Sequence, residues 1–304
     1  MPASASNQTI SYLGRRFAEA GIRLKPRHGQ NFLIDQNLLR LIVERAAVDE
    51  HDVVLEVGTG TGALTALVAQ RAAAVVTVEI DEELFQIAGE ELIPFNNVVM
   101  LRADALANKS HLNPQVVAAV KKELAAAPLR RFKLVANLPF IVATPVMANL
   151  LASSIVPDSM TVTVQKEVAQ RMVARAGSKD YGALGVWMQC QCRIELLRSL
   201  PPSVFWPSPK VNSAIVHVEL DHARRDDISD LAFFHDFVRG LFLHRRKFLR
   251  GVLASAWKDK LDKGRVARIL AQEGINPDSR AEQLDVATIV RLAEAVRCAV
   301  TGEK

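Results

Sequence analysis

Three glycines at alternate positions form the clearest chemical pattern in this chain of 304 residues. They follow the apolar run at 53–57 as Gly58-Thr59-Gly60-Thr61-Gly62, and a segment compatible with a helix comes next. A short, β-branched run predicts a strand buried in a parallel sheet. Glycines allow a sharp turn close to a ligand, and the N–H groups of the next helix point at that ligand. The pattern therefore indicates a nucleotide-type cofactor loop at Gly58 and Gly60.

The glycine spacing and two acidic residues narrow the choice of cofactor. G-x-G-x-G is not the dinucleotide pattern, and no Lys-Ser or Lys-Thr follows, which excludes a phosphate-binding P-loop. Glu79 ends the next apolar run, where a carboxylate can accept hydrogen bonds from both ribose hydroxyls of an adenosine. Asp104 follows the third run and can accept from the adenine amino group. These features predict S-adenosyl-L-methionine; the alternative is a plain glycine turn beside two surface acids.

Asn137-Leu138-Pro139-Phe140 follows a fourth apolar run and is suited to hold a target adenine. Its exocyclic amine is a weak nucleophile because the lone pair is delocalised into the ring. The Asn137 side-chain oxygen and the Leu138 carbonyl can accept its two hydrogens, while Pro139 fixes the loop and Phe140 stacks on the base. The alternative is a strand-to-helix turn in which Asn137 bonds its own backbone. Phe205, in a proline-rich loop, is expected to be a second stacking face, or else a core aromatic.

Basic residues predict a polyanionic partner. The net charge is +5 and the isoelectric point about 9.2. One basic segment precedes Asn31 and is expected to cover the cofactor while its Lys and Arg face a phosphate backbone. A second basic segment, at 245–250, is expected to lie on a helix near the C-terminus and to contact phosphates as well. The alternative for each is a solvated basic surface. The residues expected to contact RNA are Lys25, Arg27, Lys210, Arg245, Arg246, Lys247 and Arg250.

The elements that must position these residues alternate between strand and helix. Apolar runs at 53–57, 75–79, 98–101, 132–136 and 160–164, with helical segments between them, predict an α/β fold with a doubly wound, mostly parallel, Rossmann-like sheet. Ligands bind at the carboxyl ends of such strands, where all four motifs lie. Late strands are expected at 192–197 and 214–219. From about Arg224 the pattern is helical, with helices expected at 233–256, 265–272 and 286–300. The predicted domains are 1–223, with 1–22 a flexible extension that includes a short helix at 11–21, and a small all-α domain at 224–304.

Composition excludes several classes of protein. Cys190, Cys192 and Cys298 are too few for a disulfide framework, and no Cys/His pair accompanies them, so no metal site is expected. Cys190 and Cys192 are expected on one face of a strand. No apolar run approaches membrane-spanning length, and no signal-type core begins the chain. A cytoplasmic monomer with no membrane partner is expected.

The chain resembles the KsgA-type (RsmA) ribosomal RNA adenine dimethyltransferases, relatives of the erythromycin-resistance methylases. The resemblance spans nearly the whole chain, and its specificity comes from the combination of motifs. The matching segments are 28–33, the glycine loop, 78–81, Asp104-Ala105, 137–140, 165–171, Tyr181-Gly182, 205–214, 241–247 and 275–282. Two positions depart from the family pattern: Thr59 replaces a usual proline, and Phe140 replaces the commoner tyrosine.

The resemblance implies transfer of two methyl groups to N6 of each of two adjacent adenosines near the 3′ end of 16S rRNA. It also implies action on the assembling small ribosomal subunit. The donor contacts that it implies are Asn31, Leu33, Gly58, Glu79, Asp104 and Asn137, and their neighbours Gly60, Ile80 and Ala105 are also expected to bind the donor. Two alternatives are a large-subunit (23S) rRNA adenine methyltransferase of the resistance type and a non-catalytic rRNA-binding assembly factor. The basic second domain argues against a small-molecule methyltransferase.

Overall fold

The computed structural model describes residues 9–19, 21–22, 30–244 and 247–302. Lys25, Arg27, Arg245 and Arg246 lie outside the described residues. The chain forms two compact units: Met1–Ala169 with Glu195–Glu219, and Gln170–Ile194 with Leu220–Lys304. The segment Gln170–Ile194 therefore packs with the C-terminal helices, whereas the predicted boundary near Arg224 assigned it to the first domain.

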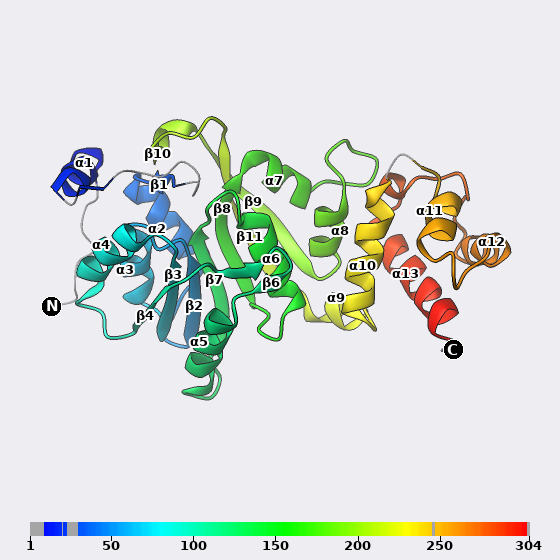
Figure 1. Cartoon of the computed structure of the whole chain (residues 1–304), viewed down its shortest axis with the longest axis horizontal. Helices are drawn as coiled ribbons and strands as arrows, with labels where there is room; N and C mark the ends of the chain where they lie inside the picture. Colours follow the sequence, from blue (N-terminus) through cyan, green and yellow to red (C-terminus); the bar gives the residue numbers. More distant parts are fainter. Residues whose placement is uncertain (1–8, 20, 23–29, 245–246, 303–304) are drawn as a thin grey trace. The chain divides into compact units, whose positions relative to one another are not determined.

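A seven-stranded sheet forms the centre of the first unit (Figure 1). In spatial order its strands are β4 (Val98–Arg102), β3 (Ala74–Glu79), β2 (Asp52–Val57), β7 (Arg131–Asn137), β8 (Ser159–Gln165), β11 (Ser213–Leu220) and β9 (Cys192–Leu200). Adjacent strands from β4 to β8 pair in parallel, and β11 pairs antiparallel to β8. Every residue of β2 and β3 is buried, as expected for β-branched strands covered on both faces. The predicted mostly parallel α/β sheet is confirmed.

Helices cover both faces of this sheet. The helices of the first unit are α1 (Ile10–Glu19), α2 (Gln36–Arg45), α3 (Ala63–Ala69), α4 (Glu82–Leu92), α5 (Pro114–Ala125) and α6 (Ala143–Ala152). Apolar side chains of α2 and α3 share one core cluster with Val54, Val75 and Val135 of the sheet. On the opposite face, α5 contacts β2 and β3 (Figure 1).

Polar residues begin several of these helices. The carboxylate of Asp35 accepts hydrogen bonds from backbone N–H groups at the start of α2, and that of Asp81 does so at the start of α4. Asn113 caps α5, whose first residue is proline. These caps set the point at which each chain segment leaves the carboxyl end of the sheet and enters its helix.

The N-terminal helix α1 is a packed element, so the prediction of a flexible extension is wrong for residues 10–19. Leu13 and Phe17 are buried in a cluster with Phe32, Leu84 and Ile87. The ring centroids of Phe17 and Phe32 lie 5.6 Å apart in an edge-to-face arrangement. An amphipathic helix that buries its apolar face gains enough free energy to remain docked.

Two small antiparallel pairings were not predicted. β1 (Phe32–Leu33) pairs with β10 (Phe205–Trp206), and β5 (Leu106–Asn108) pairs with β6 (His111–Leu112). A single-turn 3-10 helix, Pro202–Val204, precedes β10. The first pairing fixes the segment at Asn31 near the carboxyl ends of the central strands.

The second unit is helical. Its helices are α7 (Lys166–Met172, shared with the first unit), α8 (Ala183–Gln189), α9 (His222–Asp226), α10 (Leu231–Leu243), α11 (Leu249–Ala256), α12 (Lys263–Gln272), the 3-10 turn Ala281–Gln283 and α13 (Val286–Thr301). The single helix expected at 233–256 is wrong: Phe248 adopts an extended conformation and forms a β-bridge with Arg280, which separates α10 from α11. Cys190 ends α8 and Cys192 begins β9, so the two thiols do not share a strand. No helix in the described part of the chain is long and apolar enough to cross a membrane.

Candidate active site

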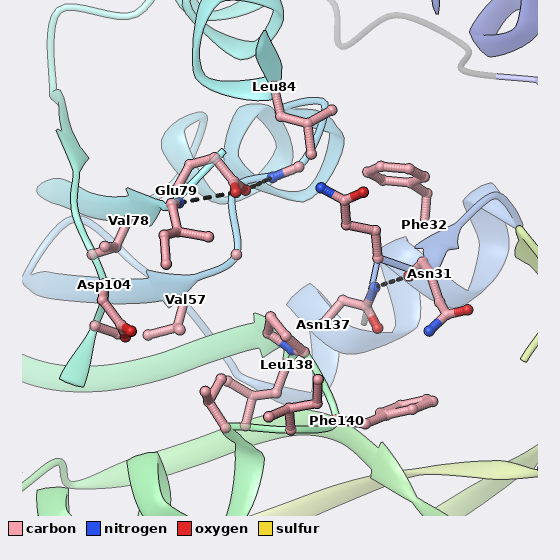
Figure 2. Close-up of a pocket in the computed structure, with 18 of the residues that line it drawn as sticks. Asn31, Phe32, Val57, Val78, Glu79, Leu84, Asp104, Asn137, Leu138 and Phe140 are labelled. Atoms are coloured by element: carbon pink, nitrogen blue, oxygen red, sulfur yellow. Dashed lines mark hydrogen bonds between the residues drawn. The ribbon is translucent and has the colours of Figure 1, made fainter. Parts of the chain in front are cut away.

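A cavity of about 220 Å³ lies at the carboxyl ends of β2, β3 and β7. Eight of the nine predicted donor-binding residues line it; they are Asn31, Gly58, Gly60, Glu79, Ile80, Asp104, Ala105 and Asn137. Figure 2 shows Glu79 and Asp104 toward one end of the cavity and Phe140 toward the other, with Asn137 and Leu138 between them. The fold therefore brings together residues that are up to about a hundred positions apart in the chain.

The glycine loop forms one wall of the cavity. Gly58 and Gly60 have backbone φ values of 87° and 58°. Residues other than glycine rarely adopt φ values in this region. A Cβ on Gly58 would lie 3.0 Å from the Pro139 ring, and one on Gly60 would lie 3.2 Å from the Phe32 ring. The loop therefore packs closely against Pro139 of the Asn-Leu-Pro-Phe turn and against Phe32.

Glu79 is held rigidly at the end of β3, with only 6% of its surface exposed. Its Oε2 accepts a hydrogen bond from the Gly60 N–H at 2.9 Å, and its Oε1 accepts from the N–H groups of Ile80 (3.0 Å) and Asp81 (2.9 Å). Burial raises the pKa of this carboxyl, and the three N–H donors oppose that rise. A carboxylate offers about four lone-pair sites, so acceptor capacity remains for a ribose hydroxyl. This arrangement suits an adenosine ligand.

Asp104 is exposed, beyond the end of β4. Its Oδ1 accepts from the Leu106 N–H at 2.9 Å, and its backbone carbonyl accepts from the Asn113 side chain at 2.9 Å. These bonds fix the carboxylate at the cavity edge, where its other lone pairs can accept from an exocyclic amine.

Asn137 bonds across the fold rather than to its own backbone. Its Nδ2 donates to the carbonyl of Asn31 at 2.8 Å, and its Oδ1 accepts from the Thr163 hydroxyl. A carbonyl can only accept, so the nitrogen must face Asn31 and the oxygen must face Thr163. Leu138 is buried beside it, and Phe140 is half-buried with its ring at the cavity edge (Figure 2). The sequence analysis did not identify Thr163 as a site residue. The one feature that could have identified it is that its hydroxyl lies within the largely apolar strand predicted at 160–164.

Two predicted site residues do not line the cavity. Leu33 and Phe205 are opposite each other in the β1–β10 pairing, and their side chains are 6% and 2% exposed within the hydrophobic core. Phe205 is therefore a core residue, and the prediction that it provides a second stacking face is wrong. Trp206, the next residue along the strand, packs instead against Phe17 and Phe32.

A buried polar network, also missed in the sequence, lies behind the glycine loop. The Glu56 carboxyl accepts from the hydroxyls of Thr65 (2.5 Å) and Thr77 (2.8 Å). Because Thr77 donates its proton to Glu56, the Thr59 hydroxyl must donate in the 2.6 Å bond between Thr59 and Thr77. Burial raises the pKa of Glu56 to about 8. Thr59 thus ties the glycine loop to β3 through its side chain.

The described basic residues lie outside this cavity. Lys210 and Lys247 are exposed. Arg250 pairs with Asp278 at 3.0 Å, and its guanidinium lies 5.8 Å from the centroid of the Phe248 ring. Lys247 lies in the connection between α10 and α11 and Arg250 in the first turn of α11, so they do not share one helix face. Within the described residues, no group of three or more His, Cys, Asp or Glu side chains is placed to hold a metal ion.

A doubly wound sheet with a cavity at the carboxyl ends of its strands and an Asn-Leu-Pro-Phe turn beside that cavity is the arrangement expected of a Rossmann-like methyltransferase. A family model described as ribosomal RNA adenine dimethylase matches residues 21–297. The chain is 38% identical over 277 residues to the ribosomal RNA small subunit methyltransferase A of Ligilactobacillus salivarius, covering 91% of each chain. The chain belongs to the ribosomal RNA adenine dimethylase family.

Solved structures show the same fold. A dimethyladenosine transferase from Plasmodium falciparum aligns with a TM-score of 0.68 at 21% identity, covering 85% of this chain and 94% of that one. The 23S rRNA methyltransferase ErmE aligns with a TM-score of 0.60 at 23% identity, covering 88% of this chain and all of that one (100%). At these identities the likeness defines the fold only and does not separate a small-subunit from a large-subunit substrate.

Proposed function

We propose that this protein transfers methyl groups from S-adenosyl-L-methionine to N6 of two adjacent adenosines near the 3′ end of 16S rRNA, giving dimethyladenosine at both. The observation that carries the proposal is the Asn137 carboxamide, whose orientation is fixed in the same cavity as Glu79 and Asp104. The full-length match to a relative named for the small subunit favours that subunit over the large one.

The residues of the cavity fit the methyl donor. Glu79 would hold the ribose, Asp104 the adenine amino group, and the glycine loop would lie against the remainder, with Asn31, Ile80 and Ala105 completing the wall. When bound, S-adenosylmethionine would supply a methyl group on a positively charged sulfur and would leave as the neutral thioether. The methylated nitrogen is then acidic and loses its proton to water, so the chain needs no strong base.

The chain acts on the target adenine mainly by positioning it. The Asn137 oxygen and the Leu138 carbonyl accept the two hydrogens of the amine, which directs its lone pair away from the ring system. Phe140 stacks on the base after it leaves its own stack. Holding the amine in one orientation converts a bimolecular encounter into an effectively unimolecular reaction.

The proposed partner is the assembling small ribosomal subunit, which sets the proposed location in the cytoplasm. The second unit carries twenty Lys and Arg against fourteen Asp and Glu, a net charge of +6, whereas the first unit carries eighteen against nineteen, a net charge of −1. The positive charge of the chain is therefore concentrated in the helical unit, which suits it to contact rRNA phosphates.

One experiment separates the candidate functions. The protein is incubated with isotopically labelled donor and, separately, with under-methylated small subunits, large subunits and free adenosine, and the label is then mapped. Dimethyladenosine at two adjacent positions of 16S rRNA, lost in Asn137→Ala, is the expected result. Label in large subunits would support the resistance-type alternative. Tight binding to small subunits without any label would support a non-catalytic assembly factor.

A further inference from the structure

Asn137 has a partner in the core that no motif identifies. Thr163 lies in the middle of β8, opposite Asn137 in the parallel β7–β8 pairing and opposite Ile215 in the antiparallel β8–β11 pairing. Its side chain is completely buried (0% exposed). A hydroxyl at this depth costs free energy unless it is hydrogen-bonded, and its proton is donated to Asn137 Oδ1.

Two bonds at opposite ends hold the Asn137 carboxamide. Thr163 fixes the oxygen from within the sheet, and the Asn31 carbonyl fixes the nitrogen from the wall of the cavity. An amide has two orientations related by a half-turn, and the reversed one would place the NH₂ group where the target amine must donate. With both bonds present, only the productive orientation is satisfied, and one lone pair of Oδ1 remains for substrate.

We infer that Thr163 is a positioning residue for methyl transfer, acting through the Asn137 carboxamide without touching substrate. The inference deepens the proposed function and rests on it for the kinetic part of the test. It also links the two halves of the site: the Asn31 segment, which lines the donor cavity, is bonded to the group that orients the acceptor base.

The fold offers a matched control two residues away. Thr161 is on the same strand and the same face, is also 0% exposed, and donates to or accepts from His217 Nδ1 at 2.8 Å. Thr161→Val and Thr163→Val remove the same hydroxyl from equally buried positions, so an effect on folding should be similar in both. Only Thr163→Val removes the bond to Asn137.

The test compares Thr163→Val, Thr163→Ser and Thr161→Val in steady-state methylation of under-methylated small subunits, with unfolding in urea measured in parallel. Thr163→Val should lower kcat by about tenfold to a hundredfold, with KM for subunits changed by less than about threefold. Thr163→Ser should restore most of the rate, and Thr161→Val should match wild type. Equal rates in the two valine variants, or a change in KM alone, would overturn the inference.

A second measurement does not depend on activity. Hydrogen exchange of the Asn137 side-chain NH₂ group is followed by NMR, with the resonance assigned by its loss in Asn137→Ala. Exchange should accelerate about tenfold or more in Thr163→Val and remain near wild type in Thr161→Val. If wild type did not methylate small subunits, the proposed function would fail, while this measurement would still decide whether Thr163 holds Asn137. Unchanged exchange in Thr163→Val would reject the positioning role.

Discussion

Glu79 illustrates how backbone contacts fix the position of a single candidate binding side chain. Three backbone N–H groups fix its carboxylate, two of them from residues of the same turn and one from the glycine loop. The sequence position of Glu79 was enough to predict that it lines the cavity, because the carboxyl end of the second strand of such a sheet faces the ligand site. The bond from the Gly60 N–H was not predictable, because it depends on the fold of the loop.

Removing this carboxylate should weaken donor binding. Glu79→Ala leaves the ribose hydroxyls without an acceptor and also leaves three N–H groups unpaired, at a cost to binding of about 1–3 kcal/mol. Calorimetric titration with S-adenosylmethionine measures it. Glu82→Gln is the control, because Glu82 is an exposed neighbour paired with Arg102 at 2.5 Å and does not line the cavity. Equal affinity in Glu79→Ala and wild type would contradict the assignment.

The two phenylalanines expected to stack on the base should behave differently from each other. Phe140→Ala should reduce turnover strongly, because base–aromatic stacking contributes about 1–3 kcal/mol, whereas Phe140→Tyr preserves the face and should be nearly silent. Phe205→Ala should instead destabilise the fold by about 3–5 kcal/mol, as for other buried aromatics. Mass spectrometry of the reacted rRNA and urea unfolding of each variant separate these outcomes. If Phe205→Ala lowered turnover without lowering stability, Phe205 would be a site residue rather than a core residue.

At the scale of elements, the sequence predicted the strands and helices that produce a clear hydrophobic pattern. The β-branched runs and the helical pattern after Arg224 correspond to observed strands and helices, and Asp35 and Asp81 cap two of those helices. The β1–β10 pairing was missed because two-residue strands show no periodicity and pair across more than 170 positions. The same reason explains the error at Phe205: a proline-rich loop looks exposed until its pairing with Leu33 places the ring in the core.

The buried network of Glu56, Thr65, Thr77 and Thr59 behind the glycine loop makes the stability of the fold depend on pH. Since burial raises the pKa of Glu56 to about 8, the folded state binds a proton more tightly than the unfolded chain, where a glutamate titrates near its ordinary value of 4.5. The contribution of this group to stability is therefore complete below about pH 4.5 and is lost as the pH rises toward about 8. The slope is at most about 1.4 kcal/mol per pH unit.

Glu56→Gln should remove this dependence. The glutamine oxygen can still accept from Thr65 and Thr77, but the side chain no longer titrates. Urea unfolding of wild type and variant across this pH range measures the difference, which should favour the variant increasingly as the pH rises. Glu82→Gln, exposed at the surface, should follow wild type. Parallel stability profiles for wild type and Glu56→Gln would show that Glu56 does not titrate in this range.

At the scale of the whole molecule, charge and chemistry are divided between the units. The first unit has the cavity and a net charge near zero, and the second has the excess of Lys and Arg. This division predicts that donor binding and rRNA binding can be altered separately. The basic residues expected to contact phosphates are Arg245, Arg246, Lys247 and Arg250. Arg250 is expected to contribute least, because its ion pair with Asp278 must break before it can contact a phosphate.

Replacing all four by glutamine should weaken binding to small subunits and flatten its dependence on salt, because each lost phosphate contact removes about 0.7–0.9 from the logarithmic slope. A matched variant replaces four other basic residues of the same unit, the exposed Lys258, Lys260, Lys263 and Arg268, and so has the same net charge. Binding to subunits is measured at several salt concentrations, and donor affinity by calorimetry. Only the first variant should lose slope, with donor affinity unchanged in both. An equal loss of slope in the two variants would mean that net charge, rather than this cluster, attracts the rRNA.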